Sequence, residues 1–135
     1  MQRIYFHERF KEIDMNQQDK IKLLAEKVFD CVTINDCRCF YHKSYLMMVC
    51  NWNPYEDRHD AGMLIEKADK DLSIEIWNGH RNGHQGQWRC RTSKKQDLQI
   101  GIYKSFNEYS KSFTKCVSEA IFKAYGLDIN PEAGV

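Results

Sequence analysis

The sequence lacks several features that would each point to a special class of protein. It has only 2 prolines and 7 glycines in 135 residues, and it has no low-complexity tract that would indicate a long disordered segment. Its longest apolar run, residues 45–50, is far shorter than the roughly 20 residues that a transmembrane helix needs. It also opens without the charged and apolar stretches of a secretory signal. We therefore expect a cytoplasmic protein with no membrane attachment.

An excess of charge of one sign is also missing. The chain has 20 Lys and Arg against 19 Asp and Glu, a formal net charge of +1. Without an overall field that attracts nucleic acid or an anionic membrane, any such binding requires a local patch. The length suits one domain over residues 1–135 with a core at 17–127. Residues 1–14 are either an edge strand of this domain or an extension of it.

Cysteine, by contrast, is plentiful, with six residues at positions 31, 37, 39, 50, 90 and 116. In a short secreted chain, this number would predict a disulfide framework. Cys90 falls in an alternating strand pattern and Cys116 lies near the start of a helical one, where free cysteines act as small apolar residues. Since no secretory signal is present, we expect reduced thiols.

Three segments space their apolar residues at i, i+3, i+4 and i+7, which predicts helices with one buried face. The first covers about 17–30, the second ends near Lys70, and the third ends at Gly126, a residue that can adopt the left-handed conformation. The candidate N-caps are Asn16 for the first, Asp57 for the second, and Ser112 or Thr114 for the third. The buried positions are Ile21, Leu24, Ala25 and Val28; Ala61, Leu64, Ile65 and Ala68; and Val117, Ala120, Ile121 and Ala124.

Between the second and third helices the apolar period changes to two, which is typical of strands with one buried face. The alternating segments are 72–77, 87–91 and 98–103. We expect these segments to form an antiparallel meander, with Asn-Gly pairs at 78–79 and 82–83 in the first turn and residues 93–97 in the second connection.

The predicted fold class is α+β, a layered sandwich in which an antiparallel sheet of three to four strands packs with three amphipathic helices. The expected order is α-β-α-β-β-β-α. The uncertain element is 45–50, apolar throughout, which is either a buried strand, as we prefer, or a loop packed on the core.

Two short motifs accompany this order of elements. Trp52-x-Pro54 leads to Asp57 and the second helix, and Ala120-Ile121-x-x-Ala124 lies in the last helix. With these motifs, residues 17–126 resemble the phage ABA-sandwich domain family, small proteins of phages and prophages whose name implies an α/β/α layered fold. Family members typically have Ser after the Pro and another Pro before the last helix, where this chain has Tyr55 and Lys115. The resemblance implies a phage genome but assigns no catalytic residue.

The densest group of soft metal ligands lies between the first two helices. A tetrahedral zinc site needs four such groups, but a Cys-x-Cys pair is narrower than the usual zinc knuckle and no second tight pair follows. We therefore expect no metal and no cofactor. The weak candidates for a zinc site are Cys37, Cys39, His42 and Cys50, with Cys31 nearby.

Residues 80–86 combine two histidines, an arginine and glycines. His80, Arg81 and His84, with exposed backbone amides, could hold a phosphate or an acidic partner. The loop lacks the lysine and following helix of a P-loop. The alternative interpretation is a solvated hairpin tip, in which Gly and Asn serve only turn geometry.

A basic surface with aromatic residues is predicted on the neighbouring strands. Such a surface can stack bases or clamp a nucleotide. In the alternative interpretation, Glu75 pairs with one of the arginines and the aromatic residues belong to the core. The residues are Arg89 and Arg91 on one strand, Lys94 and Lys95 after it, and Trp77 and Tyr103 on the neighbouring strands.

No nucleophile or metalloprotease motif is present, so we expect a protein that is not an enzyme. The phage setting favours an accessory protein that binds a host protein or a signalling nucleotide in the host cytoplasm, for example a host-defence inhibitor of the anti-CRISPR or sponge type. One alternative is a nucleic-acid-binding module that uses the basic face. A further alternative is a cysteine or zinc enzyme. Exposed strand edges also make a homodimer conceivable.

Overall fold

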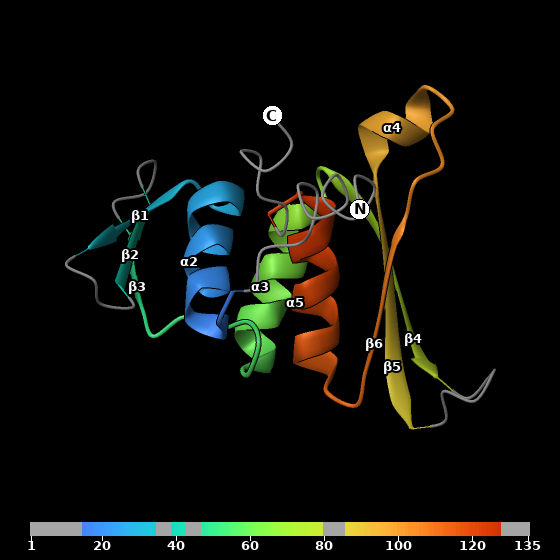
Figure 1. Cartoon of the computed structure of the whole chain (residues 1–135). Coiled ribbons are helices and arrows are strands. Elements are labelled where there is room, and N and C mark those ends of the chain that lie inside the picture. Colours follow the sequence, from blue (N-terminus) through green and yellow to red (C-terminus); the bar gives the residue numbers. More distant parts are fainter. Residues whose placement is uncertain (1–14, 35–38, 43–46, 80–85, 128–135) are drawn as a thin grey trace, which may run out of the picture.

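The structure, a computed structural model, describes residues 15–34, 39–42, 47–79 and 86–127, with the backbone alone for the parts that fall within 32–50. Three long helices and two three-stranded antiparallel sheets confirm the α+β class. The elements form successive layers (Figure 1): a small sheet, then helix α2 (Gln17–Val28), then helices α3 (Arg58–Ala68) and α5 (Phe113–Ala124), and finally a larger sheet.

The three helices begin at the residues that the sequence predicts. Asn16 and Asp57 accept hydrogen bonds from the backbone N–H groups of Asp19 and Asp60, each at 2.9 Å. Of the two candidates before α5, Ser112 is the N-cap and accepts from the Lys115 N–H at 3.3 Å. These side chains satisfy donors that the first turn of a helix leaves without partners.

Glycine ends α5 as expected. Gly126 has φ +72°, its N–H donates to the Lys123 carbonyl at 2.9 Å, and the Leu127 N–H donates back to Phe122 at 3.3 Å. A left-handed residue at this point lets the chain fold back over the last turn.

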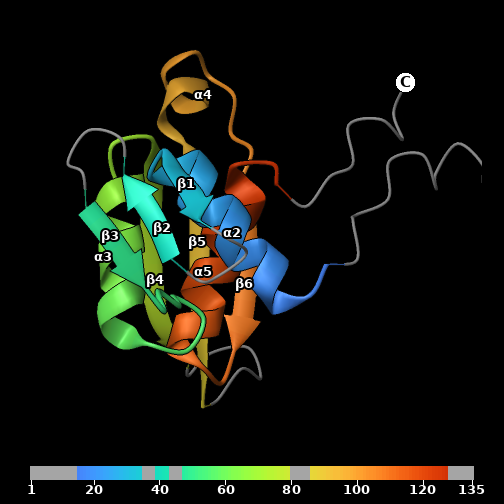
Figure 2. The same ribbon diagram turned by 90° about the vertical axis from the view of Figure 1, so that its left-hand side faces the viewer.

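The larger sheet is an antiparallel three-stranded meander as predicted, but only its first two strands lie where the sequence placed them, and Ser93 and Lys94 belong to the second strand rather than to the connection. It consists of β4 (Leu72–Gly79), β5 (Gln87–Lys94) and β6 (Phe106–Ser110), in the order β4-β5-β6. The strands are antiparallel, with Ile76 opposite Cys90 and Cys90 opposite Glu108. In both views α2, α3 and α5 lie on one side of this sheet (Figures 1 and 2). In the described part of the chain, helices therefore do not sandwich the sheet in the α/β/α order.

The prediction of a third strand at 98–103 is wrong. Helix α4 (Lys95–Gln99) follows β5 directly, and Gly101 then takes φ +81°. The N–H groups of Ile100 and Ile102 both donate to the Asp97 carbonyl, at 3.2 and 2.8 Å. This turn breaks the extended backbone that the alternating pattern indicated, because its carbonyl acceptors lie a few residues back in the same segment rather than on a neighbouring strand.

The apolar stretch at 45–50 contributes a strand, β3 (Met47–Cys50), as we preferred. It pairs with β2 (Cys39–His42), which pairs in turn with β1 (Cys31–Ile34). These strands form a separate small sheet beside α2 rather than a fourth strand of the meander (Figure 2).

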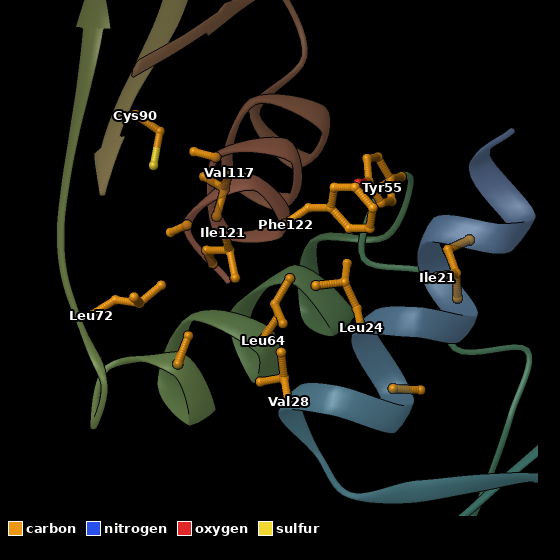
Figure 3. Packing of buried hydrophobic residues seen from close by; sticks show 14 of the residues in the cluster. Ile21, Leu24, Val28, Tyr55, Leu64, Leu72, Cys90, Val117, Ile121 and Phe122 are labelled. Carbon is orange, nitrogen blue, oxygen red and sulfur yellow. The ribbon is translucent and has the colours of Figure 1, made fainter. Parts of the chain in front are cut away.

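The core lies between the helices and the inner face of the larger sheet (Figure 3). Leu24, Leu64 and Phe122 come from three different helices and are each 0% exposed. Leu72 and Cys90 contribute from the sheet. The spacing that predicted the helices therefore identifies their buried faces, since burial of apolar area is the dominant stabilising term in such layers.

The Trp52-x-Pro54 motif lies in the turn before α3, and hydrogen bonds connect this turn with α5. The hydroxyl of Ser118 donates to the Pro54 carbonyl at 2.7 Å, and the hydroxyl of Thr114 donates to the Tyr55 carbonyl at 2.6 Å. Within the turn, the Tyr55 N–H donates to the Asn53 side chain at 3.1 Å. Buried carbonyls need such partners, so the motif has a structural role.

Two further expectations concern the ends of the chain and the membrane. Residues 1–14, predicted to be an edge strand or an extension, lie outside the described residues. Among the described helices, none has the length and apolar character that crossing a membrane requires.

Candidate functional site

The outer face of the larger sheet, away from the helices, carries a row of aromatic and arginine side chains. Register places Trp77 of β4 opposite Arg89 of β5, and Arg89 opposite Tyr109 of β6. Side chains alternate between the two faces of a strand, so the apolar residues Ile76 and Cys90 turn toward the helices while this row turns outward. No described element covers it (Figure 1).

Arg89 lies between the two aromatic rings of the row. Its guanidinium carbon is 4.9 Å from the centre of the Trp77 ring and 5.7 Å from that of Tyr109. Nη2 donates to the Asn107 side chain at 3.0 Å, while the buried Nε has no hydrogen-bond partner in the described part of the chain. Trp77 is 39% and Tyr109 is 40% exposed. Cation–π contacts at exposed sites contribute about 0.5–1 kcal/mol each and so favour this arrangement of the side chains.

The next row contains an ion pair. Arg91 donates from Nε and Nη2 to the same carboxylate oxygen of Glu75, at 3.0 and 2.6 Å. The Arg91 guanidinium is also 5.6 Å from the Trp77 ring. An exposed pair of this type adds little stability, but Glu75 offsets one of the two positive charges of the face. The alternative in which Glu75 pairs with an arginine is therefore correct for this part of the site.

The structure places the other predicted basic and aromatic residues at the end of the sheet. Lys94 is the last residue of β5, and the Lys95 side chain donates to the Asp69 carbonyl. Tyr103 is 84% exposed but lies in the loop after α4, not on a strand as expected. Trp77, Arg89 and Arg91 thus share one face, whereas Lys94, Lys95 and Tyr103 do not belong to the aromatic row.

The predicted loop site cannot be placed. His80, Arg81 and His84 lie outside the described residues. Gly86, the first described residue after them, has φ +80°, a conformation that glycine adopts readily.

The weak metal candidates are not brought into a described site. Cys37 lies outside the described residues, and Cys39 of β2 pairs in register with Cys50 of β3, while His42 pairs with Met47. For these strands the backbone alone is described. Elsewhere in the described chain, no group of three or more His, Cys, Asp or Glu residues could hold a metal ion.

Three cysteines have described side chains, and all three are free thiols in buried positions: Cys31, Cys90 and Cys116. Burial raises the pKa of Cys90 to about 12 and that of Cys116 to about 11, with nearby Glu108 adding to both shifts. Desolvation also raises the pKa of Cys31. Since the thiolate is the nucleophile, these thiols do not have the environment of a catalytic cysteine.

Sequence reasoning missed Asn107 and Tyr109, which complete the outer face. β6 has no apolar alternation, since its inward residues are Phe106, Glu108 and Ser110. The carboxylate of Glu108 binds the Lys123 side chain at 2.9 Å. The signal in the sequence was weak, because Phe106 and Tyr109 favour strands whereas Asn107 and Glu108 are depleted in them.

The chain is similar in fold to a solved phage protein. No family model matches it, and no curated protein does either. The crystal structure of a phage protein from Bacillus cereus, determined at 2.0 Å, matches with a TM-score of 0.58 and 10% sequence identity, covering 85% of this chain and 97% of that protein. At this identity the likeness concerns the fold alone.

Proposed function

We propose that this chain is a small phage or prophage accessory protein, without catalytic activity, that binds a host protein in the host cytoplasm. The outer face of the β4–β6 sheet is its binding surface. The observation that carries this proposal is the row Trp77–Arg89–Tyr109, which no described element covers and which two cation–π contacts connect. Surfaces that are ordered before binding lose little conformational entropy when they bind.

The composition of this face favours a protein partner over nucleic acid. Trp, Tyr and Arg are the residues that most often dominate the energy of protein interfaces. Phosphate binding depends on several free positive charges whose counterions are released. Here Glu75 pairs with Arg91 at 2.6 Å, and Arg89 is enclosed by two rings, so few free charges face outward.

The fold shared with the Bacillus cereus phage protein supports the phage setting. Phages use many small proteins against host defence. An inhibitor of a defence protein, such as an anti-CRISPR, is therefore the concrete form of the proposal that we favour over a sponge for a signalling nucleotide.

Affinity capture with matched variants tests this function. The tagged protein is incubated with a lysate of the bacterial host, alongside a Trp77→Ala/Tyr109→Ala double variant and a Tyr103→Ala control. Tyr103 is more exposed than either residue of the pair but lies outside the row. We expect one host protein to be retained by the wild type and by Tyr103→Ala, and retained at least about tenfold less by the double variant.

Three results would count against the proposal. Equal capture by the double variant would remove the outer face as the binding surface. Capture that disappears after nuclease treatment and weakens steeply with salt would favour the nucleic-acid-binding alternative. Tight retention of a nucleotide, with no protein, would favour the sponge.

A further inference from the structure

A second surface lies at the free edge of the same sheet. Within the described sheet, β6 has a neighbour on one side only. Along its other side runs an open cleft of about 340 Å³. Three consecutive residues of β6, Glu108, Tyr109 and Ser110, line this cleft. Because successive side chains point to opposite faces, three in a row can border one cleft only along the strand edge.

The floor of the cleft is a polar network joining α2, α5 and the turn before α3. The Lys20 side chain donates to both carboxylate oxygens of Glu119, at 3.0 and 3.1 Å, and the Tyr55 hydroxyl donates to Glu119 at 3.0 Å. Tyr55 is only 4% exposed. Burial, and then Glu119, raise the pKa of Tyr55, so its hydroxyl remains a donor. This hydrogen-bond network is therefore formed in the protein without any partner.

The unbalanced charge of the cleft is positive. Lys20 is neutralised by Glu119, and Glu108 by Lys123. Lys115, in the first turn of α5, is exposed and has no acidic partner in the described part of the chain. A negative group beside Lys115 should therefore raise the affinity of a ligand that fills the cleft.

We propose that the free edge of β6 receives an extended acidic segment of a partner protein as a fourth strand. Main-chain hydrogen bonds to a sheet edge supply affinity in this mode of recognition, and pockets for alternate side chains supply specificity. The backbone of β6 would provide the edge over five residues. Alternate side chains of the added strand would enter the cleft, with an acidic one beside Lys115. This contact shares Tyr109 with the outer face but does not use Trp77 or Arg89, so the signals of Glu108, Ser110 and Lys115 distinguish the two contacts.

The test is an NMR titration of the full chain with two capped hexapeptides, Glu-Val-Glu-Val-Glu-Val and Lys-Val-Lys-Val-Lys-Val. At up to about 1 mM peptide, where weak complexes are detectable, the acidic peptide should shift the amide signals of Glu108, Tyr109, Ser110 and Lys115. The basic peptide should bind at least about tenfold more weakly, because it meets a like charge.

Lys115→Glu is the decisive variant. Glu at this position would form a capping box with Ser112, which stabilises the start of α5, so loss of binding could not be attributed to unfolding. We expect it to reverse the preference between the two peptides. The matched control is Lys70→Glu, the same charge change at an exposed position beyond the C-terminal end of α3, which should leave the preference unchanged.

Each contrary result has a definite meaning. Shifts confined to the outer face, no shifts at β6, or equal binding of both peptides would overturn the proposal. The same holds if Lys115→Glu still prefers the acidic peptide. A concentration-dependent dimer in sedimentation equilibrium, with β6 signals affected before peptide is added, would instead assign the edge to a second copy of the chain.

Discussion

Burial determines the chemistry of Cys90 and Cys116. Each is at most 1% exposed, and burial raises their pKa values to about 12 and about 11 from the ordinary value of 9.0. The sequence predicted apolar roles for both residues from their place in a strand pattern and in a helical one. It could not predict that Cys116 donates to the Trp88 and Glu108 carbonyls, at 3.4 and 3.3 Å, because those partners come together only in the folded sheet.

These pKa shifts make stability depend on alkaline pH. Between about pH 9 and pH 12 the unfolded chain releases thiol protons that the folded protein retains. The free energy of unfolding is therefore undiminished below this range and falls as the pH rises through it. We expect it to be about 2–3 kcal/mol lower at pH 10 than at pH 8. Urea unfolding at the two pH values measures the difference.

Two tyrosine hydroxyls, one buried and one partly buried, act in the same direction. Burial raises the pKa of Tyr55 and of Tyr125, whose hydroxyls donate to Glu119 and Asp71. Replacing Cys90 by Ala should therefore reduce the loss at pH 10 without removing it. Equal stability at pH 8 and pH 10 for the wild type would show that the thiols are solvated in the folded state.

Helices were more predictable than strands in this chain, for a physical reason. The helical spacing in α2, α3 and α5 and the caps Asn16, Asp57 and Ser112 are local in sequence, and the structure confirms them. β6 is a strand because it pairs with β5, and its polar composition carries no period. The alternation of Leu98, Ile100 and Ile102 was misleading, because Gly101 and the Asp97 carbonyl form a turn there.

Substitutions at two glycines, Gly101 in this turn and Gly62 in α3, should have opposite effects on stability. A Cβ at Gly101 or at Gly62 would meet no atom within 4 Å, but Gly101 has φ +81°. Gly101→Ala should therefore lower the free energy of unfolding by about 1 kcal/mol through backbone strain. Gly62→Ala, on the exposed side of α3, should raise it by about 0.5–1 kcal/mol. Thermal or urea unfolding of both variants gives the comparison, and a stabilising Gly101→Ala would contradict the turn.

At the scale of the whole molecule, the layered order explains why the outer face is open. All three long helices lie on one side of the β4–β6 sheet, and the small sheet lies beyond α2 (Figures 1 and 2). The sequence predicted that Trp77, Arg89 and Arg91 share a polar face, but it could not predict whether a helix covers that face. Which side the helices occupy depends on long-range packing that no local pattern contains.

The same arrangement concentrates exposed apolar side chains. Among the residues whose burial is described, the exposed large hydrophobic ones are Trp77, Ile100, Ile102, Tyr103 and Tyr109. All five lie on the larger sheet or on the connection between β5 and β6. Trp77 and Tyr109 belong to the outer face, where exposed aromatic groups that lie together commonly mark an interaction surface, whereas Ile100, Ile102 and Tyr103 lie on the connection outside the row.

Oxidative footprinting of the captured complex tests the central claim, binding through the outer face, most directly. Hydroxyl radicals modify exposed Trp, Tyr and Met side chains, and Met63 on α3, which is partly exposed, serves as the internal control. The account predicts that oxidation of Trp77 and Tyr109 falls several-fold in the complex while that of Met63 is unchanged. Oxidation of Trp77 and Tyr109 at the rates of the free protein, with protection at Met63 instead, would contradict it.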